Sequence, residues 1–129
     1  MIKKKPTENR GRIDTVTLRK PITLNRSKIT SVVIEIDHIN YGLKKDGSGL
    51  NTKARSNFTI KDIEKFLKLL DGEEIAAVDH TGKISRFSVR IDSPIKEKFF
   101  GQTFIMIFDI DSDKDNELHT ITLFPGWQK

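Results

Sequence analysis

The sequence contains no cysteine and no long apolar run, and both absences exclude whole classes of protein. Without cysteine there is no disulfide bond, no thiolate nucleophile and no cysteine-ligated zinc site. No stretch approaches the roughly 18–20 apolar residues that a membrane-spanning helix needs. The lysines at positions 3–5 are not followed by the apolar segment of a signal peptide. We therefore expect a cytoplasmic protein that does not bind a membrane.

What the sequence does contain is the composition of one folded, basic domain. Its 129 residues are 36% hydrophobic and 32% charged, which is enough for a single hydrophobic core. The formal net charge of +5 favours an anionic partner such as RNA. Residues 1–12 are polar and basic without periodicity, which predicts a flexible N-terminal arm, and residues 13–129 form the predicted domain.

One helix is predicted with clear signals at both ends. Thr59 is a favourable N-cap, and Asp62 follows three positions later in the arrangement of a capping box. Apolar residues then recur at helical spacing up to Leu70, with lysine and glutamate on the other side. Gly72 can adopt the left-handed conformation that ends a helix. The pattern predicts a helix over residues 60–70.

Strand-like segments separated by turns follow this helix. They cover residues 74–78, 84–91, 103–110 and 118–124. Consecutive segments joined by short turns, with a helix to cover one face, predict an α+β fold with a four-stranded antiparallel meander sheet packed on one main helix. Upstream, residues 14–24 predict a short extended segment, which Pro21 would restrict to an edge or a bend. Residues 31–37 fit a strand and a helix nearly equally well.

Alternating side chains place polar groups on one face of the predicted sheet. In the segment 84–91, Phe87 and every second residue from it are expected to face the core, so the residues between them point outward. The outward residues are Arg86, Ser88 and Arg90 on this segment and Thr120 and Thr122 on the last one. Cationic and hydroxyl-bearing side chains on an open face are suited to binding a phosphodiester.

A glycine- and lysine-rich loop over residues 42–57 adds further positive charge. Its candidates for RNA contact are Lys44, Lys45, Lys53, Arg55 and Ser56. A flexible cationic loop suits a phosphate chain because it requires no particular base sequence. The alternative is a solvated loop, since its glycines are not followed by the Gly-Lys-Ser/Thr of a phosphate-binding loop.

Three histidines are the candidates for proton transfer. His38 ends an apolar run and opens the basic loop, where a general base would be useful, although a structural histidine is the alternative. His80 lies in a turn, and His119 is expected to face away from the two outward threonines. The acidic turn over residues 109–117 lacks the glycine and glutamate of a calcium loop, so we predict a solvated hairpin tip and no metal site.

The order of these parts resembles the barnase–EndoU–colicin–RelE superfamily of metal-independent ribonucleases, in particular its phage- and toxin-associated branches. The similarity covers about residues 30–127 and depends on element order and on a His…Arg-Ser…Thr-x-Thr pattern. It implies a RelE-like fold and no cofactor. It also implies RNA cleavage through attack of the 2′-hydroxyl on the adjacent phosphorus, which leaves a 2′,3′-cyclic phosphate.

The resemblance also assigns roles to particular residues. Those implied in catalysis are His38 as base, Arg55 and Arg86 as phosphate clamps, and Thr120 and Thr122 as donors to the transition state. Those implied in RNA binding are Lys44, Lys45, Lys53, Ser56, Ser88 and Arg90. An antitoxin or immunity protein is a further candidate partner. Where some branches have a second histidine or an arginine, this chain has Asn40 to Lys44, so the alternative function is a non-catalytic module that binds a protein partner.

Overall fold

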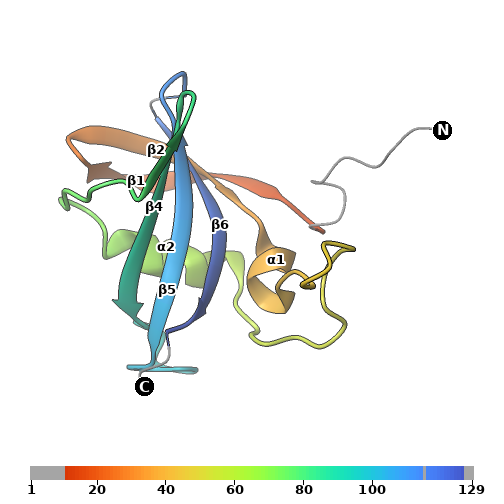
Figure 1. Cartoon of the computed structure of the whole chain (residues 1–129). Helices are drawn as coiled ribbons and strands as arrows, with labels where there is room; N and C mark the ends of the chain where they lie inside the picture. Colours follow the sequence, from red (N-terminus) through yellow and green to blue (C-terminus); the bar gives the residue numbers. More distant parts are fainter. Residues whose placement is uncertain (1–10, 115, 127–129) are drawn as a thin grey trace.

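The computed structural model describes residues 11–114 and 116–126, in which a curled sheet is combined with short helices (Figure 1). The strands are β1 (Asp14–Leu24), β2 (Ser27–Ile34), β3 (Asp79–Thr81), β4 (Ile84–Asp92), β5 (Thr103–Asp111) and β6 (Glu117–Pro125). The helices are α1 (Ile36–Tyr41) and α2 (Ile60–Lys68). The basic loop joins α1 to α2.

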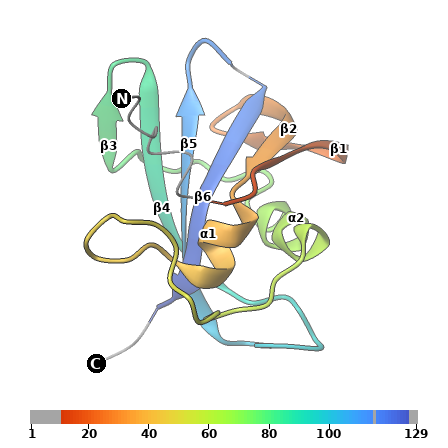
Figure 2. The same cartoon turned by 90° about the vertical axis from the view of Figure 1, so that its right-hand side faces the viewer.

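The six strands found in the described residues form one mixed sheet. Their order is β1-β2-β6-β5-β4-β3. β2 runs parallel to β6, and every other neighbouring pair is antiparallel. The predicted four-stranded antiparallel meander packed on one main helix, with its RelE-like fold, is therefore wrong. Two strands that precede both helices enter the sheet beside the last strand, and the sheet curls into half a barrel (Figures 1 and 2).

The two additional strands form a hairpin. Asn25 and Arg26 both have positive φ, 50° and 69°, as in the tight type I′ turn that matches the twist of two antiparallel strands. The register of β1 against β2 shifts between Thr17 and Ile22, around Pro21, which lacks the N–H that a ladder requires. β1 lies at the edge of the sheet, the position that the proline predicted.

Residues 31–37 contain both of the elements that their pattern allowed. β2 ends at Ile34 and α1 begins at Ile36, with Glu35 between them as the N-cap of the helix. The partner of β2 is distant in the chain, since the backbone N–H of Thr30 donates to the carbonyl of Asn116 at 2.9 Å, 86 positions away. This parallel pairing brings the start of α1 against β6.

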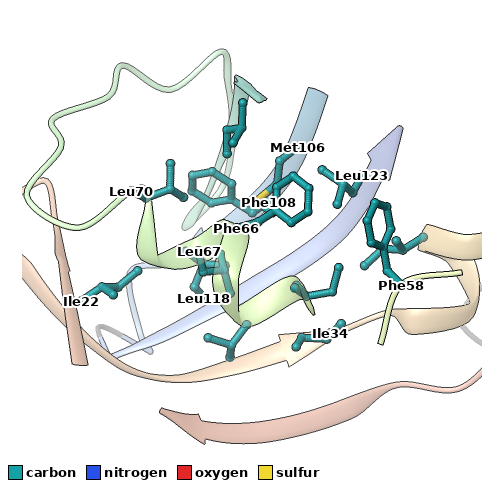
Figure 3. Close-up of a cluster of buried hydrophobic side chains, with 14 of the residues drawn as sticks. Ile22, Ile34, Phe58, Phe66, Leu67, Leu70, Met106, Phe108, Leu118 and Leu123 are labelled. Atoms are coloured by element: carbon teal, nitrogen blue, oxygen red, sulfur yellow. The ribbon is translucent and has the colours of Figure 1, made fainter. Parts of the chain in front are cut away.

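Helix α2 packs its apolar stripe on the inner side of the curled sheet (Figure 3). The predicted capping box is confirmed, because Thr59 N–H donates to the Asp62 carboxylate at 3.0 Å and Asp62 N–H donates to the Thr59 hydroxyl at 3.2 Å. Gly72 has the positive φ, 84°, predicted after the helix. Val89 is partly buried, and the following side chains of α2 and of the strands β4 to β6 are buried: Ile63, Phe66, Leu67, Phe87, Phe104, Met106, Phe108, Ile121 and Leu123.

The predicted strand over residues 74–78 is wrong, and most of the predicted N-terminal arm lies outside the described residues. Residues 74–78 are not a strand; β3 instead covers Asp79–Thr81, where a turn was expected. Residues 1–10 of the predicted arm lie outside the described residues, while Arg12 binds Asp37 of α1 at 2.9 Å. Within the part of the chain that is described, no helix is long and apolar enough to cross a membrane.

Candidate functional site

The face of β4, β5 and β6 that points away from α2 carries a row of charged side chains; Figure 2 shows the three strands side by side. Cross-strand pairing puts Arg86 opposite Asp109 and Asp109 opposite His119, so each strand contributes one residue. Arg86 donates to Asp109 from Nε at 2.8 Å and from Nη2 at 3.0 Å. These hydrogen bonds raise the pKa of Arg86 above its ordinary value. The Arg86 guanidinium is therefore charged and already paired with a carboxylate.

Glu35 is a buried carboxylate between two histidines. Its backbone N–H donates to the Thr120 carbonyl at 3.2 Å, which fixes it at the junction of β2 and α1. Its Oε1 lies 3.3 Å from Nδ1 of His38, and its Oε2 lies 2.7 Å from Nε2 of His119. The second contact is short but is not aligned as a hydrogen bond, and that Nε2 atom is buried. The side chain of His38 is 11% exposed and that of His119 is 37% exposed, so His119 is the histidine that a ligand can reach.

Arg55 enters the site from the basic loop and binds neutral partners. Its Nη2 donates to Thr122 Oγ1 at 2.8 Å and to the His38 carbonyl at 3.3 Å, and its Nε donates to the Ile39 carbonyl at 3.2 Å. The guanidinium also lies 5.9 Å from the ring centroid of Phe124. No carboxylate of the described residues pairs with it. Burial lowers the pKa of Arg55 because the charged form is desolvated, yet an arginine stays protonated at neutral pH.

Asn40 anchors the loop that carries Arg55. Its carbonyl accepts from the backbone N–H groups of Arg55 at 2.7 Å and Ser56 at 3.1 Å. Its side chain accepts from Phe58 N–H at 2.8 Å and donates to the Phe58 carbonyl at 2.9 Å. The Arg55 guanidinium also packs closely against Gly42, since a Cβ added there would lie 2.7 Å from Arg55 Nη1. The glycine-rich loop is thus held at the point where Arg55 enters the site.

A β-bulge separates Thr120 from Thr122. The register of β5 against β6 shifts so that Thr120 pairs with Phe108 and Thr122 with Ile107, with one extra residue between the threonines. Thr120 therefore shares the core face with Phe108, is fully buried, and has a hydroxyl without a hydrogen-bond partner in the described structure. The prediction that both threonines point outward is wrong for Thr120. Thr122 shares the open face with His119, which was expected on the opposite side.

Three of the five predicted catalytic residues lie together in the structure: Arg55, His38 and Thr122. The Arg55 side chain donates to the backbone carbonyl of His38 and to the hydroxyl of Thr122. Most predicted RNA contacts lie at the surface. The exposed ones are Lys44, Lys45, Lys53, Ser88 and Arg90. Ser56 is only 7% exposed, so its hydroxyl is not available on the surface as an RNA contact requires.

Sequence reasoning missed Glu35, Asp109 and Asn40. Glu35 interrupts an apolar run, and a carboxylate in such a run signals a buried charge that needs partners. Asp109 falls in the predicted acidic turn, but β5 continues to Asp111. Asn40 acts through Phe58, 18 positions later, for which the local pattern carries no signal.

The fold and the site define an α+β protein whose mixed, curled sheet carries a carboxylate–histidine pair and a partly buried arginine on its open face. Within the described residues, no group of three or more histidine, aspartate or glutamate side chains is arranged to hold a metal ion. Comparisons with protein-family models, with curated proteins and with solved structures found no match for this chain.

Proposed function

We propose that this protein is a metal-independent endoribonuclease of toxin or phage type, which cleaves by 2′-hydroxyl attack and leaves a 2′,3′-cyclic phosphate. Arg55 carries the proposal. It is a partly buried guanidinium whose hydrogen-bond partners among the described residues are all neutral, and its Nη1 makes no hydrogen bond among them. A guanidinium that is partly desolvated and has no counter-charge among the described residues is stabilised by an anion, so this position favours one. The planar guanidinium matches the oxygen atoms of a phosphate.

His119 supplies the base in this proposal. Glu35 lies against its Nε2 and favours the proton on that nitrogen, which leaves a lone pair on Nδ1. Nδ1 accepts the proton of the 2′-hydroxyl, whose oxygen then bonds to phosphorus while the bond from phosphorus to the 5′ oxygen breaks and that oxygen takes a proton from water. We prefer His119 to His38 as the base because more of its side chain is exposed, 37% against 11%. His38 then supports Glu35 from the buried side.

Arg86 and the surface cations bind the rest of the RNA. The Arg86 side chain is 46% exposed, so a phosphate can share its guanidinium with Asp109 or replace that carboxylate. The loop lysines contribute charge without demanding a base sequence. RNA as the partner and the cytoplasm as the location belong to the same proposal.

Incubation of the purified protein with total RNA in EDTA tests this function. Fragments with 2′,3′-cyclic phosphate ends are expected. Arg55→Gln and His119→Gln should each slow cleavage by about 10²–10³-fold, because donors to the transition state and general bases contribute about this much. Lys114→Gln, at the exposed β5–β6 turn, is the matched control and should cleave like the parent. A parent protein that leaves RNA intact, or cleavage that survives Arg55→Gln, would contradict the proposal.

A non-catalytic module that binds an antitoxin or immunity protein is the second candidate. The Arg86–Asp109 pair favours it, because a carboxylate occupies the guanidinium that a substrate phosphate would use. Asp109→Asn distinguishes the two functions. In a nuclease the substitution frees Arg86 for the substrate and changes the rate of cleavage. In a binding module neither the parent nor the variant cleaves RNA.

A further inference from the structure

A groove between β1 and α2 is lined with positive charge. Its volume is about 710 Å³. The cations that line it are Arg19 and Lys20 from β1 and Lys61, Lys65 and Lys68 from α2. We propose that this groove is a second nucleic-acid site, which binds the sugar–phosphate backbone of single-stranded RNA.

The cations of this groove have no counter-charge in the described structure. None of the five forms an ion pair there, and Glu64 is the acidic residue among those that line the groove. Some cations elsewhere on the surface do have partners, since Lys83 lies 2.9 Å from Asp113 and Arg86 lies 2.8 Å from Asp109, so the groove is distinguished by five cations around one hollow. Like charges around one groove repel one another, so a bound polyanion lowers the free energy.

The spacing of the lysines fits an extended ligand. Lys61, Lys65 and Lys68 follow one another at helical spacing of four and three residues, so they share one side of α2. At about 1.5 Å of rise per residue, Lys61 and Lys68 are about 10 Å apart along the helix axis. Arg19 and Lys20 face them from β1 across the groove. A single phosphate would meet part of this row, whereas a chain of phosphates can meet all of it.

The floor of the groove favours RNA over an acidic protein. Leu18, Ile22 and Leu67 line it, but they are only 9%, 3% and 0% exposed (Figure 3 shows Ile22 and Leu67). These three side chains therefore offer little surface to the anchoring residue that a protein partner would insert. Lysine acts as a point charge with little geometric demand, which suits a phosphate backbone. No aromatic residue among those of the described chain lines the groove, so base stacking there is not expected and the binding should be indifferent to sequence.

The groove is separate from the candidate active site. The active site lies on the open face of β4, β5 and β6, whereas the groove lies on the α2 side, next to the edge strand β1. RNA in the groove would be held by nucleotides other than those being cleaved. The choice of RNA as the polyanion rests on the proposed function, but binding to the groove can be measured without cleavage.

The test measures binding of a short fluorescent 2′-O-methyl oligouridylate, which 2′-hydroxyl attack cannot cleave. The double variant Lys65→Gln, Lys68→Gln should raise Kd about tenfold or more at low salt. It should also reduce the magnitude of the slope of log K against log salt by about 0.7 for each lost contact. The matched control is Lys28→Gln, Lys96→Gln, which removes the same charge from exposed positions outside the groove and should change Kd little.

Three results would overturn the groove as an RNA site: no binding by the parent, equal weakening in both double variants, or displacement of the probe by oligoglutamate at equal charge. The last would assign the groove to an acidic protein. Cleavage kinetics separate this proposal from the proposed function. The groove variant should raise KM and leave kcat unchanged, whereas Arg55→Gln should lower kcat. RNA that binds through the groove without being cleaved would support the groove and contradict the nuclease.

Discussion

Arg55 links more of the site than any other side chain described above. It joins the basic loop to β6 through Thr122 and to α1 through the carbonyls of His38 and Ile39. Its charge is not compensated by a carboxylate of the described residues, so its neighbours determine both its position and the attraction of the site for an anion. Predictions about single residues therefore concern the groups that Arg55 touches.

Isosteric substitution of the two threonines of β6 should have opposite effects. Thr120→Val replaces a buried hydroxyl that has no partner in the described structure, so the free energy of unfolding should rise by about 1 kcal/mol. Thr122→Val removes the acceptor of a 2.8 Å hydrogen bond from Arg55, so RNA cleavage should fall at least about tenfold. Urea unfolding and a cleavage assay check both variants. Equal effects of the two substitutions on cleavage would contradict the assignment of opposite faces.

Gly42→Ala should impair the site as well as the fold. Gly42 has φ 74° and ψ 159°, a conformation nearly restricted to glycine, so alanine should cost about 1–3 kcal/mol in stability. The added Cβ would also lie 2.7 Å from Arg55 Nη1 and displace the guanidinium, so cleavage should slow under conditions where the variant is still folded. Gly47→Ala is the control, since it has similar positive φ, 75°, but open space around the new Cβ. Its stability should fall while its cleavage rate stays near that of the parent.

Among the elements, α1 is short and depends on contacts outside itself. Its six residues cannot form a stable helix alone, because helix nucleation is unfavourable and few hydrogen bonds follow it. Arg12 holds its first turn, where its side chain donates to Asp37 and its backbone N–H donates to the same carboxylate at 2.8 Å. The hydrogen bond from the Arg12 side chain is the main cause that lowers the pKa of Asp37.

The pH dependence of stability should therefore include a contribution from Asp37. A carboxylate with a lowered pKa in the folded state stabilises the fold fully above its ordinary pKa, about 3.9, and loses this contribution as pH falls through the lowered value. Asp37→Asn should thus be less stable than the parent at pH 7, and the difference should shrink below about pH 4. Chemical denaturation across this range measures it. A difference that is constant with pH would exclude the ion pair as the cause.

Helix α2 can be tested at its N-terminus. Thr59→Ala removes the acceptor of the Asp62 N–H bond and should lower the free energy of unfolding by about 1 kcal/mol. Thr59→Ser keeps a hydroxyl there and is the matched control, with a much smaller expected loss. Denaturant unfolding of both variants provides the measurement. Equal losses would mean that the methyl group of Thr59, not its hydroxyl, matters for stability.

The whole molecule is assembled from distant parts of the chain, which should make folding slow. β2 must pair with β6 in parallel, with Thr30 hydrogen-bonded to Asn116 across 86 positions. Non-local pairing has an entropic cost of loop closure before it gains contact energy. We expect refolding on the millisecond-to-second scale typical of sheets with distant pairing, measured by stopped-flow circular dichroism. Refolding complete within about 100 μs would contradict this sheet order, since only locally paired folds reach that speed.

Features that depend on neighbouring residues were predictable from the sequence. The capping box of Thr59 and Asp62, the φ of Gly72 and the core-facing residues of β4 and β5 follow from spacing and side-chain alternation over a few positions. The outward positions of Arg86 and Arg90 follow from the same alternation. For the candidate site, alternation selected Thr122, whereas His38 and Arg55 were chosen from their places at the end of an apolar run and in the basic loop and from the family resemblance; their roles stay predictions.

Tertiary structure alone decided the sheet order, the face of each β6 side chain and the partners of each charge. Alternation assumes an uninterrupted ladder, so one bulge in β6 reversed the faces expected for Thr120 and His119. Glu35 meets His119 only because β2 lies beside β6, and strands distant in the chain leave no local mark of their pairing. Short-range sterics and hydrogen bonds select the elements of this protein, whereas burial of the shared core selects which elements meet and hence which side chains form the site.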